Sequence, residues 1–105
     1  MKKETELQKA ILDLLAHIPK SYFFRTSSGL IRTEIGNYFR TGKKGCPDIC
    51  GVMNGKFIGI EVKIGKNKLS PFQKQAQEDI ERSGGIYVTA YSLDNVENLI
   101  KQLCG

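Results

Sequence analysis

The sequence contains one histidine, no tryptophan and no long hydrophobic run. With His17 as the only imidazole, a histidine-based catalytic centre is disfavoured, and we assign this residue no role. No apolar stretch approaches the roughly 20 residues that a membrane-spanning helix needs. The first residues, Met-Lys-Lys-Glu-Thr-Glu, lack the apolar segment of a signal peptide. We therefore expect a cytoplasmic protein that does not associate with a membrane.

The cysteines are few and odd in number: Cys46, Cys50 and Cys104. No two of them have the CxxC spacing that is typical of zinc and redox sites. Cys46 and Cys50 would share one face of a strand, but a soft-metal site there lacks two further ligands. We therefore expect three reduced thiols, mostly buried.

Acidic residues are also fewer than basic ones, since 11 Asp and Glu stand against 16 Lys and Arg, a formal net charge of +5. A basic surface favours polyanions, of which nucleic acid is the commonest. Solubility alone is the other explanation for a charge of this size. The 105 residues suit one globular domain, spanning residues 1–105.

Apolar spacing and turn residues predict the order α-β-(loop)-β-β-α-β-α. The predicted elements are a helix (4–18), a strand (22–26), a basic loop with a short strand or turn (27–45), two strands (48–53 and 56–63), a helix (70–83), a strand (86–90) and a helix capped by Ser92. Ser70 and Gln73 have the spacing of a capping box around Pro71. The order predicts a single α/β domain with a mixed sheet and helices on both faces.

Asn54-Gly55 between two apolar runs is the strongest short-range indication of a two-residue type I′ hairpin. The register that follows from this loop, carried down both strands, places Asp48 opposite Glu61. Their Cβ atoms would then lie about 4.5–5.5 Å apart, where two like charges destabilise a sheet. A hard cation such as Mg²⁺, shared by the two carboxylates, is the simplest compensation.

Strand alternation places Gly59, Glu61 and Lys63 on one face, and glycine leaves this patch uncrowded. The backbone carbonyl of Val62 is a further candidate metal ligand. A metal here would polarise a phosphoryl oxygen and activate water, while the lysine orients that water or neutralises charge on the phosphate. An ordinary salt-bridged strand surface is the alternative. The apolar strands disfavour it, because an unneeded carboxylate is costly between two buried faces.

Pro47-Asp48, followed after twelve residues by Glu61-Val62-Lys63, resembles the PD-(D/E)XK nuclease signature. Together with Gly45-Cys46 before the aspartate and Ser70-Pro71-Phe72-Gln73 after the lysine, the chain resembles the virus-type replication-repair nuclease (VRR-NUC) domain. The likeness extends from Glu4 to about Leu99. It implies the restriction-endonuclease-like fold of that superfamily.

The resemblance implies an endonuclease that depends on Mg²⁺ or Mn²⁺, with Asp48, Glu61 and the Val62 carbonyl as metal ligands and Lys63 as the catalytic lysine. Free-standing members of the family resemble Holliday-junction resolvases and act as homodimers on branched DNA, and larger relatives act in DNA repair. We therefore expect a homodimer that cleaves branched DNA. A restriction-type enzyme would need a further element to read the major groove, and the chain is short for one.

Two further site residues are implied by the resemblance. The family has a glutamate on the first helix; Glu4 fits this position better than Glu6, although either acid could simply favour the helix N-terminus. Gln73 matches the site glutamine of the family, but it also completes the capping box. We expect it to do both only if its side chain is free to leave the cap.

Seven basic residues flank these acids and are candidates for phosphate contacts: Arg25, Arg32, Arg40, Lys43, Lys44, Lys66 and Lys68. Three consecutive aromatic residues, Tyr22 to Phe24, suit either a platform for base stacking or core packing, and core packing is favoured. Two other classes of function remain: a DNA-binding module without activity and an interaction subunit on a nuclease scaffold. Binding of a divalent metal discriminates between them and the nuclease.

Overall fold

The computed structural model describes residues 2–26, 29–32 and 34–104. In chain order the elements are α1 (Lys2–Leu15), β1 (Ser21–Arg25), β2 (Gly29–Arg32), β3 (Tyr38–Thr41), β4 (Ile49–Met53), β5 (Lys56–Val62), α2 (Pro71–Arg82), β6 (Ile86–Ala90) and α3 (Leu93–Cys104). A four-stranded sheet has the order β1-β4-β5-β6, and β2 pairs with β3 separately. Only the β5–β6 pair of the large sheet is parallel. The predicted α/β domain with a mixed sheet is confirmed.

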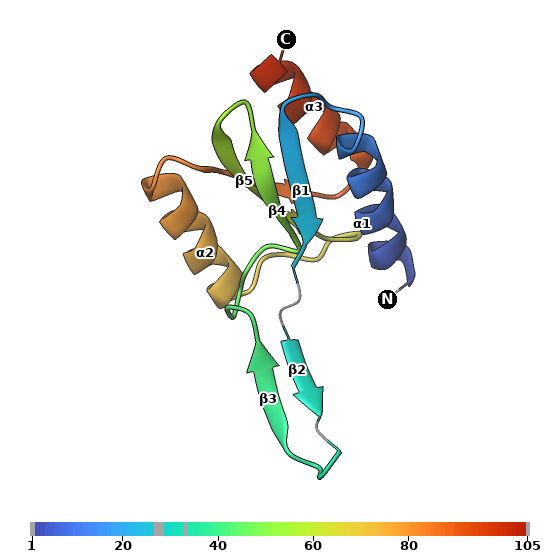
Figure 1. Ribbon diagram of the computed structural model, residues 1–105, viewed down its shortest axis with the longest axis vertical. Coiled ribbons are helices and arrows are strands. Elements are labelled where there is room, and N and C mark those ends of the chain that lie inside the picture. The colour runs from blue at the N-terminus through green and yellow to red at the C-terminus, as the bar shows by residue number, and fades with distance from the viewer. Residues whose placement is uncertain (1, 27–28, 33, 105) are drawn as a thin grey trace.

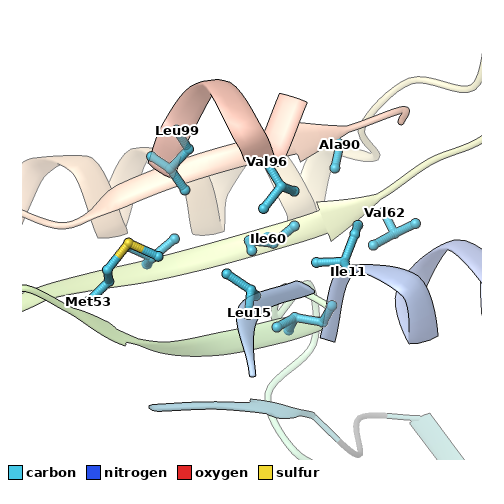
Figure 2. Packing of buried hydrophobic residues seen from close by; sticks show 10 residues of the cluster. Ile11, Leu15, Met53, Ile60, Val62, Ala90, Val96 and Leu99 are labelled. Atoms are coloured by element: carbon cyan, nitrogen blue, oxygen red, sulfur yellow. The ribbon is translucent and has the colours of Figure 1, made fainter. Parts of the chain in front are cut away.

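The helices lie on both sides of the sheet, with α1 and α3 against one face and α2 on the other (Figure 1). Aliphatic side chains fill the space under α1 and α3: Ile11 and Leu15 pack with Val96 and Leu99 over Ile60 at the centre of β5 (Figure 2). Ile11 and Leu15 are four residues apart on α1, and Val96 and Leu99 are three apart on α3, so each pair lies on one face of its helix. Within the described part of the chain, none of the helices has both the length and the apolar character needed to cross a bilayer.

The segment predicted as a basic loop contains more regular structure than expected. β2 and β3 pair in antiparallel fashion, and this ribbon projects away from the sheet (Figure 1). A turn that includes Gly36, with a φ of 91°, joins the strands. Because this segment is rich in basic residues and glycines, its two short apolar runs were not recognised as a pair of strands. Ser27, Ser28 and Thr33 of this segment lie outside the described residues.

The three aromatic residues of β1 do not share one environment. Phe23 packs against the core, as predicted, but Tyr22 is 73% exposed and Phe24 is 49% exposed. Core packing was therefore the wrong prediction for these two side chains. Strand alternation turns them to the face of α2, and α2 lies over the other edge of the sheet, against β6.

Candidate active site

The β4–β5 hairpin has the predicted turn and register. Asn54 and Gly55 have φ values of 52° and 79°, the positive values that a type I′ turn requires at both positions. All five residues of β4 pair with β5 as predicted, and the last pair is Ile49 opposite Ile60. Because the register is set by this turn, the acids that follow the last pair are brought to the same end of the hairpin.

Asp48 lies one residue before β4 and is held in place by its neighbours. The Thr26 N–H donates to the Asp48 carbonyl at 2.9 Å, and Thr26 Oγ1 donates to the Pro47 carbonyl at 2.7 Å. The side chain reaches across to β5, where Oδ2 accepts a hydrogen bond from the Val62 N–H at 2.8 Å. This bond fixes the carboxylate beside the end of β5 and next to Glu61.

Gly59 has a different role from the predicted one. A Cβ atom at this position would lie 2.7 Å from Pro47 Cγ and 3.3 Å from Ile80 Cδ1. The missing side chain therefore makes room for the proline ring and for α2, rather than for a ligand. Since Pro47 precedes Asp48 directly, Gly59 helps to position the first acid of the site.

Glu61 is the one buried charged residue among the described side chains, with 3% of its surface exposed. Its Oε2 accepts a hydrogen bond from Gln73 Nε2 at 2.9 Å, and Lys63 Nζ lies 4.0 Å from the same oxygen. Its Oε1 is buried without a hydrogen-bond partner. Burial first, and then the charge of Asp48, raise the pKa of Glu61 to about 8, against the opposing charge of Lys63. Protonation of Glu61 thus relieves the like-charge conflict expected from the sequence.

Lys63 faces the site as strand alternation predicts, whereas the Val62 side chain lies in the core and only its backbone borders the site. The ammonium group of Lys63 approaches Glu61, and its side chain is only 15% exposed. The Lys63 N–H donates to the Ala90 carbonyl at 3.0 Å, toward β6. Because successive peptide groups point to opposite sides of a strand, the N–H and the carbonyl of Val62 are directed toward β4 and Asp48. The carbonyl therefore has the direction that a metal ligand would need.

Gln73 has two partners at once. Its Oε1 accepts a hydrogen bond from the Ser70 N–H at 2.8 Å, and Ser70 Oγ accepts from the Gln73 N–H at 3.2 Å, which completes the predicted capping box. Its Nε2 donates to Glu61. The expectation that the side chain must leave the cap to reach the site was therefore wrong, because the two ends of one amide serve the two purposes.

This double role leads to a testable difference between Gln73→Ala and Ser70→Ala. Each variant breaks the capping box and should cost about 1 kcal/mol of stability. Only Gln73→Ala also removes the hydrogen bond that orients Glu61, so we expect it to weaken Mg²⁺ or Mn²⁺ binding by about 10–100-fold. Calorimetric titration of each variant with the metal measures this difference in affinity. Equal metal affinities in the two variants would limit Gln73 to capping.

Of the two candidate acids on α1, the structure brings Glu4 toward the site. Glu4 is half-buried, and its charge contributes to the raised pKa of Glu61. Glu6 is exposed. The sequence pattern of α1 had favoured Glu4 for the same reason, the face on which it lies. Glu4 is far from the other acids in the sequence, and the packing of α1 against the sheet reduces that separation in space.

Tyr87 is a polar neighbour of the site that the sequence analysis missed. It lies on β6 opposite Gly59, is 7% exposed, and its hydroxyl is buried without a hydrogen-bond partner. Burial, followed by the charges of Glu61 and Asp48, raises the pKa of Tyr87, so the phenol stays neutral. Only the pairing of its strand with the strand of Glu61 could have indicated Tyr87. That pairing joins segments that are distant in the sequence, so no local pattern contains it.

Five of the seven predicted DNA-contacting residues are exposed. Arg25, at the end of β1, and four lysines in the flanking loops are exposed: Lys43, Lys44, Lys66 and Lys68. Lys44 Nζ lies 3.9 Å from the ring centre of Phe72, at the start of α2. Arg32 and Arg40 belong to β2 and β3, but their side chains lie outside what the structure describes.

The cysteines are all free thiols, as expected, but they differ in burial. Cys50 is buried, Cys46 is half-buried and Cys104 is exposed, so the prediction of mostly buried thiols holds only in part. Burial and the neighbouring thiol of Cys46 raise the pKa of Cys50 to about 12, which keeps it protonated and unreactive.

The donor set of the site can be compared with the needs of a divalent metal. Among the described residues, no three carboxylate, thiol or imidazole side chains form a ready-made metal cluster. Mg²⁺ commonly takes only one or two carboxylates and completes its shell with water or phosphate oxygens. Asp48, Glu61 and the Val62 carbonyl match that smaller set. A buried carboxylate oxygen without a partner, Glu61 Oε1, fits a cation at this position.

The sequence matches no protein-family profile, and it has no significant similarity to a curated protein.

Proposed function

We propose that this chain is a metal-dependent DNA endonuclease of the VRR-NUC type, within the PD-(D/E)XK superfamily. The observation that carries the proposal is the buried Oε1 of Glu61, which lacks a partner beside a second carboxylate and a lysine. A buried carboxylate next to a second carboxylate is costly, and a site that serves only the fold would have no reason to keep the pair. A divalent cation accounts for both the pair and the unused oxygen.

In this proposal Asp48, Glu61 and the Val62 carbonyl hold Mg²⁺ or Mn²⁺, and the metal supplies Lewis acidity and a water of lowered pKa. The Val62 N–H orients Asp48, and Gln73 orients Glu61 from α2. Lys63 is placed to orient the attacking water or to stabilise negative charge on the phosphate. Glu4 is half-buried, its charge contributes to the raised pKa of Glu61, and it is the candidate for a further acid.

The substrate we propose is branched DNA such as a Holliday junction, cut by a homodimer. The exposed lysines around the site suit contacts to phosphates, which carry no sequence information. A two-fold dimer would present two sites to a symmetric junction. The alternative is a DNA-binding or interaction module without activity, for which the basic loops alone would suffice.

The test is a cleavage assay on labelled four-way junction, flap, nicked and plain duplex DNA, each with Mg²⁺, with Mn²⁺ and with a chelator. We expect metal-dependent cleavage that is strongest on branched DNA. Cleavage of every substrate at equal rates would retain the nuclease and exclude the junction preference. DNA binding without cleavage under either metal would favour the module without activity.

A further inference from the structure

The exposed aromatic pair of β1 lies on the same face of the sheet as the proposed active site. Tyr22 pairs with Val52 and Phe24 with Cys50, and Cys50 in turn pairs with Gly59. Directly opposed residues share a face, so these rows lie on the side that α2 covers. The next row along the strands is that of Asp48 and Glu61, about 7 Å beyond Phe24.

This part of the sheet is left open. α2 packs against β6 at the far edge, whereas β1 forms the opposite edge of the sheet. Three apolar side chains remain exposed on the open part: Tyr22 (73%), Phe24 (49%) and Val52 (44%). The rings of Tyr22 and Phe24 lie 6.3 Å apart between centroids, with a tilt of 48°. They form an aromatic platform at the edge of the sheet, beside the acids.

A basic loop lies next to the row of Phe24 and Cys50. Lys43 lines a cavity of about 200 Å³ between Cys50 and α2, on this face of the sheet, where Ala76 and Ile80 of α2 also contribute. Lys44 follows in the same exposed loop and lies over Phe72. Arg25 is adjacent in sequence, but alternation turns it to the other face of β1. Exposed rings next to lysines are the combination that single-stranded nucleic acid uses, since bases stack on the rings and phosphates contact the charges.

We propose that Tyr22 and Phe24 form a stacking platform for unpaired bases of a DNA strand that leads to the Asp48–Glu61 site. This inference rests on the proposed nuclease function and specifies its substrate as DNA with an unpaired region next to the cut. A second copy of the chain suits the surface less well. Two-fold self-contact through this face would bring Lys43 close to its own copy.

The experiment measures binding in the presence of a chelator, so that it does not depend on cleavage. The protein carries Tyr22→Ala with Phe24→Ala, and two matched variants serve as controls: the ring-preserving pair Tyr22→Phe with Phe24→Tyr, and Ile35→Ala, an exposed apolar residue between β2 and β3. The ligands are single-stranded DNA, an abasic oligonucleotide of the same length, and duplex DNA. A 2-aminopurine base in the single strand reports stacking directly.

We expect the double alanine variant to bind single-stranded DNA at least about 10-fold more weakly and to lose the quenching of 2-aminopurine. Affinity for the abasic strand and for duplex should be unchanged, and both controls should behave as the wild type. Equal losses on all three ligands, or no loss on single-stranded DNA, would overturn the proposal. So would a change in oligomeric state in the alanine variant with unchanged DNA affinity, which would assign the face to a second copy.

The two proposals fail separately. If the wild type cuts no DNA, but removal of the two rings weakens its binding to single-stranded DNA, the platform is supported and the nuclease function is not. If it cuts branched DNA and the alanine variant binds single strands normally, the nuclease stands and the platform does not.

Discussion

Replacement of Asp48 by asparagine is expected to reduce metal-dependent DNA cleavage by about 10³-fold or more, because a metal ligand worth several kcal/mol in the transition state is weakened. The fold should be retained. The asparagine oxygen can still accept the hydrogen bond from the Val62 N–H that the aspartate accepts at 2.8 Å. A single-turnover cleavage assay on junction DNA measures the loss.

The same variant separates binding from catalysis. Since Asp48→Asn removes a negative charge near the path of the phosphates, its affinity for DNA in a chelator should equal or exceed that of the wild type. Glu78→Gln, a charge removal at an exposed position on α2, is the matched control and should leave cleavage unchanged. Cleavage by Asp48→Asn within about 10-fold of the wild type would place the metal elsewhere.

Replacement of Glu61 by glutamine is expected to abolish cleavage and yet to stabilise the metal-free protein at high pH. The folded state raises the pKa of Glu61 from the ordinary value of 4.5 to about 8, through burial and Asp48 first, with Lys63 opposing and Glu4 adding to the effect. The folded protein therefore binds a proton that the unfolded chain has released. The contribution of Glu61 to stability is therefore fully present below pH 4.5 and is lost as the pH rises to about 8.

The slope of this fall can reach about 1.4 kcal/mol per pH unit, and a neutral glutamine removes it. The free energy of unfolding of the wild type and of Glu61→Gln is measured by urea denaturation in a chelator at several pH values within this window, with Glu78→Gln as control. Added Mg²⁺ or Mn²⁺ should restore stability at pH 8 only where Glu61 is present, because a ligand of the folded state stabilises it. Parallel curves for the wild type and Glu61→Gln would show that Glu61 is an ordinary ionised carboxylate.

Much of the candidate site could be predicted because it depends on local rules. Asn54-Gly55 sets the turn, the turn sets the register, and a period of two side chains places the acid and the lysine on one face. The capping box at Ser70 follows equally from a spacing of three residues. Each of these features involves residues that are neighbours in the chain or across one short turn.

The remaining features depend on which surfaces α2 and β6 cover, and no local pattern contains that information. Gln73 reaches Glu61 because α2 packs over β5 and β6, and Gly59 is required because Pro47 and Ile80 meet there. The exposure of Tyr22 has the same origin: α2 leaves the β1 edge open. Short-range sterics and side-chain periodicity can be predicted from residues that are neighbours in the sequence, whereas contacts between distant segments form only when the whole chain packs.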